Sequence, residues 1–589
     1  MLFDVSFLKK SLVAAAVIII VIIIVGGSVG YYSMTKPAPS VTSVTGVTGA
    51  ATSGVEQVVR IGDTTASEST SMDPAMNFED LDPIYSMYDR LVTYAPPDYS
   101  KVVPMLADSW DVSPDGLTYT FHLHSGITFT GTNDTVDAAA VKFSIERVQA
   151  INGPPAWLLR PDGGVVNITS IDVLDPLTIR FTLGAVSGSF LPIMANAVSS
   201  VMDPNLIAAN NGTDFGSTWL NEHSAGSGPF SLQQWTRGQE LDLVANPNYW
   251  RGAVKLDKVI WTNVPEATDK IFGVERGDLD IVGDLSPDQL PLVSSIPGIQ
   301  LVRNWDLTTV YFGMNLKAPI TLPNGTVATP FSDRRVRMAV KLAVNYTAIV
   351  DVLGKGVTIG LGGFIPKGML GYDPSLVPIQ DVARAKELMN EAGYGGGFTV
   401  TMLAEPGSQS AGVAWADMGL EVRQDLAAIG ITVNVQVTEG ATLLRTYRAR
   451  QAQMVIMNWN KDYSDPDDFT FPFCDGSLSH RVNYDNATID SLITQASQEV
   501  NQTKRAQLVV QAQQLLYDDG PWVILYQPLI VTVVGAQLQP LSAFQNIFWF
   551  DYWQMYKVAQ ASTTTSMIMI GVADYRRLLA SFSCFFFDT

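Results

Sequence analysis

The sequence predicts a mixed α/β protein of two or three domains that is preceded by one N-terminal membrane segment. The chain has 589 residues, which is too long for a single hydrophobic core. Stretches with the period of a strand alternate with stretches that have the period of a helix along residues 58–558. An almost pure run of Val, Ile and Ala stands close to the N-terminus.

The N-terminal run has the length and the flanks of a membrane helix. It follows Lys9 and Lys10 and continues to Tyr32, so it reaches the roughly 20 residues that cross a hydrocarbon core. The lysines before it and the tyrosine pair after it fit a positive-inside orientation and an interfacial anchor. Residues 1–34 are therefore predicted to anchor the chain. The alternative is a cleaved signal segment and a secreted protein, which the long core and the lack of a prompt Ala-x-Ala site disfavour.

A polar segment separates the anchor from the body. Residues 35–57 are rich in Ser, Thr, Gly and Pro without an apolar period, which predicts a flexible stalk and a body outside the cell. Seven N-x-[ST] sequons fit that location and predict a glycoprotein: Asn133, Asn167, Asn211, Asn324, Asn345, Asn486 and Asn501. At the far end, residues 559–589 are predicted to form an irregular, poorly ordered tail.

The clearest strand follows the turn signal at 113–116. Leu117, Tyr119, Phe121 and Leu123 alternate with polar residues there, which is the period of a half-buried strand. Apolar residues at helical spacing predict four helices: residues 141–148 after a cap at Thr135, residues 336–344 after Ser332 and Asp333, residues 382–392 between Asp381 and Gly393, and residues 508–516 before Gly520 and Pro521. Because no internal repeat is evident, a solenoid or propeller is not expected.

Composition excludes several classes of function. The formal net charge is −20 and the sequence pI is about 4.6, so the chain offers no basic face for nucleic acid. Its only cysteines are Cys474 and Cys584. They rule out a disulfide framework and a thiolate-rich metal site.

A series of short motifs then points to a family. PMLADSW stands at 104–110, SPDGLTYTF at 113–121, GSGPF at 226–230, NPNYW at 246–250, YFGMN at 311–315 and WNKDYSDP at 459–466. Each motif is weak alone, and the pair GSGPF and NPNYW is the most specific. In this order, the series resembles the family-5 extracellular solute-binding proteins of ABC importers, the peptide-binding and nickel-binding group.

The resemblance implies a two-lobed periplasmic-binding-protein fold with a hinge. It divides the chain into a first lobe, an inserted subdomain and a second lobe: residues 58–88, 223–310 and 521–558 for the first lobe, 89–222 for the subdomain, and 311–520 for the second lobe. It also implies a monomeric, non-enzymatic receptor without a cofactor. Such a receptor closes its lobes on a peptide or oligosaccharide and delivers it to the permease subunits of the importer.

The resemblance also suggests where a ligand would bind. Asp462 stands at the aspartate of the W-x-x-D-Y-x-D-P motif, where peptide-binding members place a carboxylate that fixes the ligand's α-ammonium. Trp459 and Tyr463 are expected to form apolar walls beside it. Met72 and Asp73 lie where the family's first strand enters the cleft, and their backbone could contact the ligand.

Plainer interpretations of these residues remain open. Asp462 and Asp465 could cap a turn before Pro466, and Met72 with Asp73 could form a plain turn. Asp467 and Asp468 are expected to be solvated. The motifs place no basic residue opposite a peptide's carboxylate, so oligosaccharides and other neutral solutes remain alternatives to peptides.

Three other functions compete with that of an importer's receptor. An anchored glycoside or peptide hydrolase is disfavoured because no G-x-S-x-G, H-E-x-x-H or P-loop motif occurs. A metal carrier would need three or four ligands. His122 and His124 lie on the polar face of a strand, and His223 and His480 are isolated. A surface receptor without a transport role is not separated from an importer subunit by the sequence.

Overall fold

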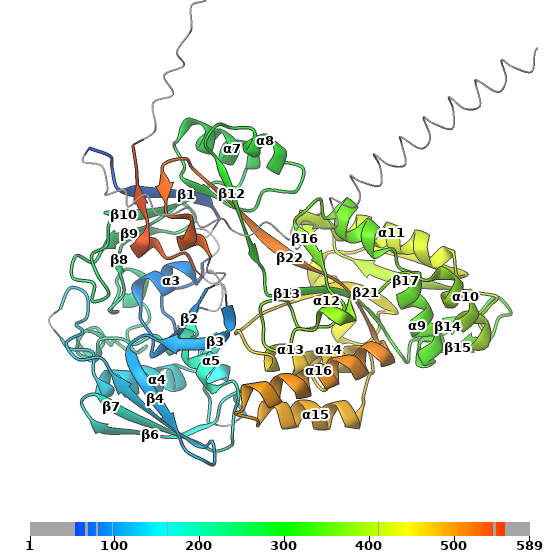
Figure 1. Cartoon of the computed structure of the whole chain (residues 1–589), viewed down its shortest axis with the longest axis horizontal. Coiled ribbons are helices and arrows are strands. Elements are labelled where there is room, and N and C mark those ends of the chain that lie inside the picture. The colour runs from blue at the N-terminus through cyan, green and yellow to red at the C-terminus, as the bar shows by residue number, and fades with distance from the viewer. Residues whose placement is uncertain are drawn as a thin grey trace, which may run out of the picture. The chain divides into compact units, whose positions relative to one another are not determined.

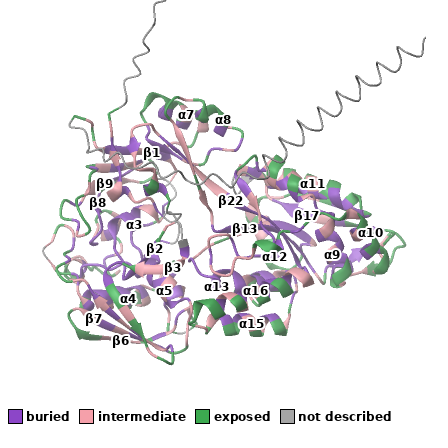
Figure 2. Cartoon of the chain, viewed as in Figure 1, coloured by how far each residue is buried: buried purple, intermediate pink, exposed green. Residues whose placement is uncertain are grey.

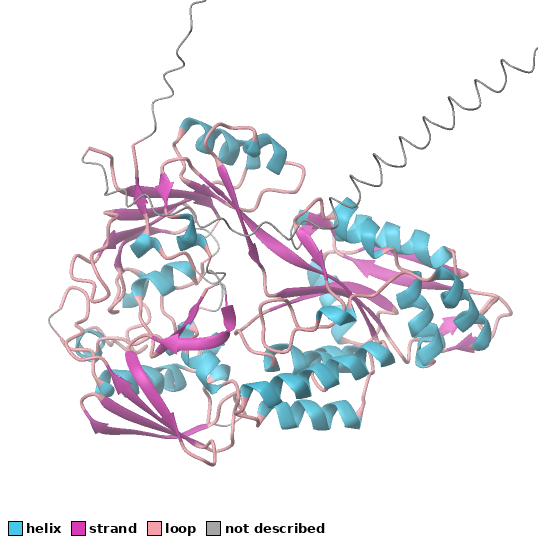
Figure 3. Cartoon of the chain, in the orientation of Figure 1, coloured by secondary structure: helices cyan, strands magenta, loops and turns pink. Residues whose placement is uncertain are grey.

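The structure is a computed structural model of the chain. It describes residues 54–559 apart from short gaps: 65–68, 78–80, 97, 133, 162, 410–411 and 546–548. The predicted anchor and nearly all of the stalk and of the C-terminal tail lie outside the described residues. Within the part that is described, no helix is both long and apolar enough to cross a membrane. The described body is α/β, as predicted (Figure 3).

A mixed sheet of 12 strands forms the framework of the described body. Its order is β20-β17-β21-β13-β22-β11-β1-β10-β9-β8, and β12 and β16 also pair with β22 (Figure 1). Its strands are β1 Val58–Asp63, β8 Phe230–Thr236, β9 Glu240–Ala245, β10 Lys258–Asn263, β11 Ile281–Val282, β12 Gln300–Trp305, β13 Thr308–Met314, β16 Thr358–Gly360, β17 Phe398–Ala404, β20 Ile431–Val437, β21 Met454–Asn460 and β22 Trp522–Val534.

Strand β22 joins the two halves of this sheet, and Figure 1 shows it crossing between them in orange. Its first part pairs with β13 and β16, and its second part pairs with β11 and β12. The exchange of partners occurs at Pro528 and Leu529, where proline offers no N–H to a ladder. This pairing means that the chain crosses from one half of the sheet to the other within β22. The predicted domain boundaries stay a prediction.

A second, four-stranded sheet is built within residues 89–222 in the order β4-β5-β7-β6. Its strands are β4 Ala107–Val112, β5 Thr118–Leu123, β6 Ile168–Asp175 and β7 Thr178–Leu183. The remaining short strands of the described chain form separate two-stranded sheets: β2 Val92–Ala95 with β3 Asp98–Pro104, β14 Ile320–Thr321 with β15 Val327–Ala328, β18 Ser408–Gln409 with β19 Val413–Ala414, and β23 Leu538–Gln539 with β24 Tyr556–Lys557. In β5 the side chains of Tyr119, Phe121 and Leu123 are buried and those between them are half-buried. The predicted alternation is therefore confirmed.

Helices cover the sheets and turn their exposed faces outward (Figure 2). They are α3 Asp82–Met87, α4 Ala138–Ile151, α5 Phe190–Met194, α6 Pro204–Ala209, α7 Ala267–Arg276, α8 Leu290–Ser294, α9 Arg334–Ala343, α10 Val382–Glu391, α11 Trp415–Ala427, α12 Gly440–Arg448, α13 Asp467–Cys474, α14 Ser477–Arg481, α15 Ala487–Ser497 and α16 Gln502–Asp519.

The four predicted helices are confirmed as α4, α9, α10 and α16. Asp333 and Asp381 cap α9 and α10 as expected, and Gly520 ends α16 in the left-handed conformation. The expected cap of α4 at Thr135 is wrong. Asp137 caps this helix instead, because its Oδ1 accepts the backbone N–H of Ala140 at 2.8 Å.

A buried ion pair fastens α4 to the turn that follows β1. Both guanidinium nitrogens Nη1 and Nη2 of Arg147 donate to Asp73, at 2.9 and 2.7 Å. The two side chains are 1% and 0% exposed. Asp73 Oδ1 also accepts the N–H of Ala75. A pair held this far from solvent tolerates the loss of one partner poorly.

Replacing Asp73 with Asn should lower the free energy of unfolding by about 3–5 kcal/mol, since it leaves a buried guanidinium without its counter-charge. Asp172→Asn is the matched control, because Asp172 pairs with Arg180 at 3.1 Å on the surface. Urea unfolding measures both variants. Equal midpoints for the two variants would contradict a structural role for Asp73.

Candidate functional site

A cavity of about 500 Å³ lies where the segment 157–187 meets the chain that leaves β21. Trp157, of the 3₁₀ turn Pro154–Leu158, forms one wall together with Val165 and Val186. The opposite wall comes from the end of β21 and from α13 and α14, and includes Trp459, Asp462 and Tyr463. Three of the predicted site residues therefore line one cavity. Its walls come from the predicted subdomain and from the predicted second lobe.

The aromatic walls are held by neighbouring groups. Trp459 pairs with Thr309 of β13, and its indole Nε1 donates to the carbonyl of Asp468 at 2.7 Å. The ring of Tyr463 is buried and meets Trp157 edge-on, with 6.4 Å between ring centroids. These contacts fix the orientation of large apolar faces along the cavity.

Asp462 supplies an acidic group to this cavity. Its backbone N–H donates to Asp468 Oδ2 at 2.7 Å and its carbonyl accepts from Asn196, but no side chain or N–H of the described chain donates to its carboxylate. Burial raises the pKa of Asp462 to about 6, against a smaller lowering by Lys461. The Asp462 carboxylate is thus partly desolvated and available to a ligand.

Asp467 and Asp468 were expected to be solvated, and this expectation is wrong. Both side chains are nearly fully buried. Asp468 Oδ2 accepts the N–H groups of Asp462 and Tyr463, which bends the chain back on itself. Burial, together with the neighbouring Asp462, raises the pKa of Asp468 well above its ordinary value. Asp468 therefore adds a second acidic group beside Asp462.

A buried charge cluster supports the floor of the site. Arg505 of α16 donates to both oxygens of Asp465, at 2.6 and 2.5 Å, and lies 3.0 Å from Asp467 Oδ1. Asp465 Oδ1 also accepts the N–H of Asp467, so the turn-capping interpretation of Asp465 is confirmed. Burial raises the pKa of Asp467 to about 6, while Arg505 opposes this shift. The guanidinium of Arg505 thus forms ion pairs with both Asp465 and Asp467.

The same cluster connects the two walls. The hydroxyl of Ser189 lies 3.0 Å from Asp465 Oδ1 and 2.8 Å from Asp467 Oδ2. Gly188 donates to the carbonyl of Ser497 and accepts from Arg505. A Cβ at Gly188 would stand 2.5 Å from Cζ of Arg505, so this close approach requires glycine.

Met72 and Asp73 lie elsewhere. Both are fully buried, and the backbone N–H of Met72 donates to Asn221 while that of Asp73 donates to Ser71. Ligand contact by these two residues stays a prediction, and it would have to compete with these bonds.

His122 and His124 are paired with Asp111 and Asp108 at 3.0 and 2.7 Å. No cluster of three or more metal-ligating side chains occurs in the described part of the chain.

Comparisons with known proteins identify the family of the chain. The model of the bacterial extracellular solute-binding proteins, family 5, matches residues 101–479, which is more than half of the chain. Heme-binding protein A of Haemophilus influenzae is 27% identical over 475 residues, covering 77% of this chain and 83% of that protein. Di/tripeptide-binding protein 2 of Pseudomonas aeruginosa is 27% identical over 487 residues, covering 78% and 88%.

Solved structures are similar as well. The periplasmic binding protein DppA from Helicobacter pylori, in complex with the peptide STSA, has a TM-score of 0.65 and 25% identity over 85% of this chain and 98% of its own. HbpA2 from Haemophilus parasuis has a TM-score of 0.75 and 22% identity, covering 86% and 100%. These likenesses confirm the predicted two-lobed α/β fold.

Gly188→Ala should destabilise the protein by about 1–3 kcal/mol, because the added methyl group must displace a guanidinium that is hydrogen-bonded to both oxygens of Asp465 and to the backbone carbonyls of Gly188 and Ala496. Gly396→Ala is the control, since a Cβ there meets no atom within 4 Å. Chemical denaturation compares the two variants. If Gly188→Ala unfolds at the wild-type midpoint, the close packing of Arg505 on Gly188 is refuted.

Proposed function

Since the chain belongs to family 5 of the bacterial extracellular solute-binding proteins, we propose that it captures a peptide through the peptide's α-ammonium group, with Asp462 as the anchor. The chain is a solute-binding receptor outside the cytoplasm and not an enzyme. In the proposed cycle it closes on its ligand and passes the ligand to the permease of an ABC-type importer. Residues 1–34 would tether it to the membrane.

The charge of the cavity carries this proposal. Its described lining contains three carboxylates, those of Asp462, Asp467 and Asp468, and no Lys, Arg or His. Only Asp467 has a guanidinium within 4 Å. A ligand ammonium at Asp462 would add a charge-assisted hydrogen bond, which is worth about 1.5–3 kcal/mol. A positive end group is therefore the feature that this cavity is best suited to recognise.

The apolar walls suit the rest of a short peptide. Trp157 and Val186 face the cavity from one side and Trp459 from the other, so a ligand between them contacts both walls. A ligand that bridges two walls stabilises their closed arrangement by its difference in affinity for the closed and open states. Heme-binding protein A is named for haem, whose carboxylates would find no cation in the described lining and which brings no ammonium group to Asp462. A peptide is the better match.

Asp462→Asn should weaken binding of trialanine by about 2 kcal/mol or more, roughly thirtyfold, because the ammonium loses its counter-charge. Asp485→Asn, at an exposed site, should bind like the wild type. Isothermal titration calorimetry gives both affinities. An unchanged affinity in Asp462→Asn would remove Asp462 from the site and leave the receptor function itself intact.

Peptide affinity should also depend on pH with a defined sign. The pKa of Asp462 in the free protein is raised to about 6. Between that pH and the pKa of the peptide's α-ammonium group, about 8, both groups are charged and binding is nearly constant, whereas below pH 6 the affinity should fall by up to about tenfold per pH unit. Titrations at pH 7.5, 6 and 5 measure this, and Asp462→Asn should lose the dependence. Tighter binding at pH 5 than at pH 7.5 would contradict the proposal.

A further inference from the structure

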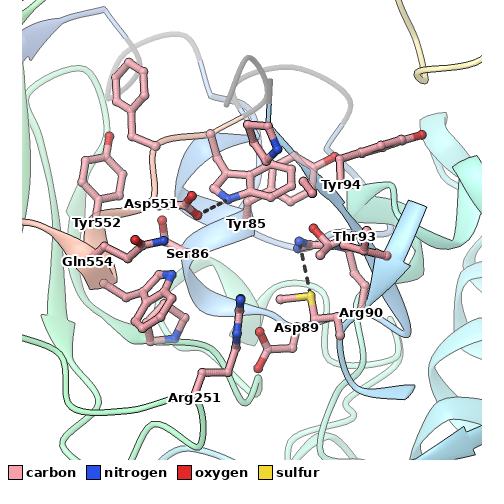
Figure 4. A pocket seen from close by; sticks show the side chains of 18 of the residues that line it. Tyr85, Ser86, Asp89, Arg90, Thr93, Tyr94, Arg251, Asp551, Tyr552 and Gln554 are labelled. Atoms are coloured by element: carbon pink, nitrogen blue, oxygen red, sulfur yellow. Dashed lines mark hydrogen bonds between the residues drawn. The ribbon is translucent and has the colours of Figure 1, made fainter. Parts of the chain in front are cut away.

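A separate, smaller cavity of about 210 Å³ lies between α3, the strands β2 and β3, and the C-terminal residues 549–554 (Figure 4). It shares no lining residue with the cavity at Asp462. Drug-sized ligands occupy roughly 300–1,000 Å³, so this cavity suits a molecule of only a few heavy atoms.

Arg90 is the unusual group in this cavity. Its side chain is fully buried, and its guanidinium carbon lies 4.4 Å from the ring centroid of Tyr85 and 4.9 Å from that of Trp549. Its Nη1 donates to the carbonyl of Tyr88 at 3.0 Å and its Nη2 to Met105 Sδ at 3.7 Å, but no ion pair joins it to a carboxylate of the described chain and its Nε has no hydrogen-bond acceptor. Thr93 Oγ1, also on the lining, is buried without a partner. A buried arginine is normally paired, so these atoms indicate a polar ligand.

Both positively and negatively charged side chains line this smaller cavity. Figure 4 shows the guanidinium groups of Arg90 and Arg251 and the carboxylate of Asp551 directed toward it. Arg251 is exposed at the mouth and stacks on Trp553 at 5.0 Å. Of the described residues only Trp549 donates to the Asp551 carboxylate, at 3.2 Å.

Asp89 also lines the cavity, but its carboxylate is already satisfied. It accepts hydrogen bonds from Ser227, Tyr249 and Trp250 at 3.0, 3.2 and 2.8 Å. Among the described residues, the charged groups of this lining that form no ion pair are therefore the guanidinium groups of Arg90 and Arg251 and the carboxylate of Asp551.

We propose that this cavity is a second solute site, which binds a free α-amino acid with its carboxylate at Arg90 and Arg251 and its ammonium at Asp551. A simple anion would face Asp551 without compensation, and a simple cation would face two guanidinium groups. A small zwitterion meets both signs at once, and its size matches the cavity. This site goes beyond the peptide-binding function and does not depend on it.

The test is calorimetric titration of the full-length chain with glycine, propionate and ethylamine. Glycine should bind, and propionate and ethylamine should each bind at least tenfold more weakly. Arg251→Gln should weaken glycine binding at least tenfold. Asp551→Asn should do the same for glycine and should strengthen propionate binding, because the anion no longer faces a carboxylate. Arg237→Gln is the matched control, because Arg237 is also exposed and stacks on Trp235 at 4.2 Å outside the cavity.

Three results would overturn the proposal. They are the absence of glycine binding at millimolar concentration, equal affinity for glycine and propionate, and wild-type glycine affinity in Arg251→Gln. Asp462→Asn separates the two sites, because it should keep glycine binding while peptide binding falls. Loss of glycine binding in that variant would assign glycine to the cavity at Asp462 and refute the second site.

Discussion

The buried pair between Asp465 and Arg505 holds the walls of the candidate site together. Both oxygens of Asp465 accept from the guanidinium, and both side chains are almost fully shielded from water. A pair of this kind is costly to break, since either partner alone would be an uncompensated buried charge. It fixes the start of α13, and with it the turn that carries Asp462. Asp465 also accepts a hydrogen bond from Ser189 of the opposite wall, so the same ion pair contacts both walls of the cavity.

The distribution of charge around this pair explains the character of the site. Arg505 is shared between Asp465 and Asp467, and no cation of the described lining remains for Asp462 and Asp468. Those two carboxyl groups lie side by side in a partly desolvated place, and both have raised pKa values. A bound ammonium group would relieve this arrangement. Under the proposed function, these buried carboxyl groups favour a ligand that carries a positive charge.

Local features of the fold could be read from the sequence because their causes are local. The alternation at Tyr119 and Phe121 and the caps at Asp333 and Asp381 depend only on residues a few positions away. The motif at 459–466 likewise predicted that Trp459, Asp462 and Tyr463 lie together, and all three line one cavity, while their role in binding stays a prediction. The burial of Asp467 could not be predicted, because it depends on Ser189, which is 278 positions away. Trp157 and Val186 carry no sequence signal, since only the fold brings them to the cavity.

The most direct test of the central claim compares one peptide in two chemical forms. Trialanine and N-acetyl-trialanine differ at the group that is proposed to meet Asp462, and calorimetric titration of the full-length protein measures both. The account predicts that the free peptide binds and that acetylation, which removes the positive charge, weakens binding by at least thirtyfold, about 2 kcal/mol. Equal affinity for the two forms would contradict an ammonium anchor at Asp462.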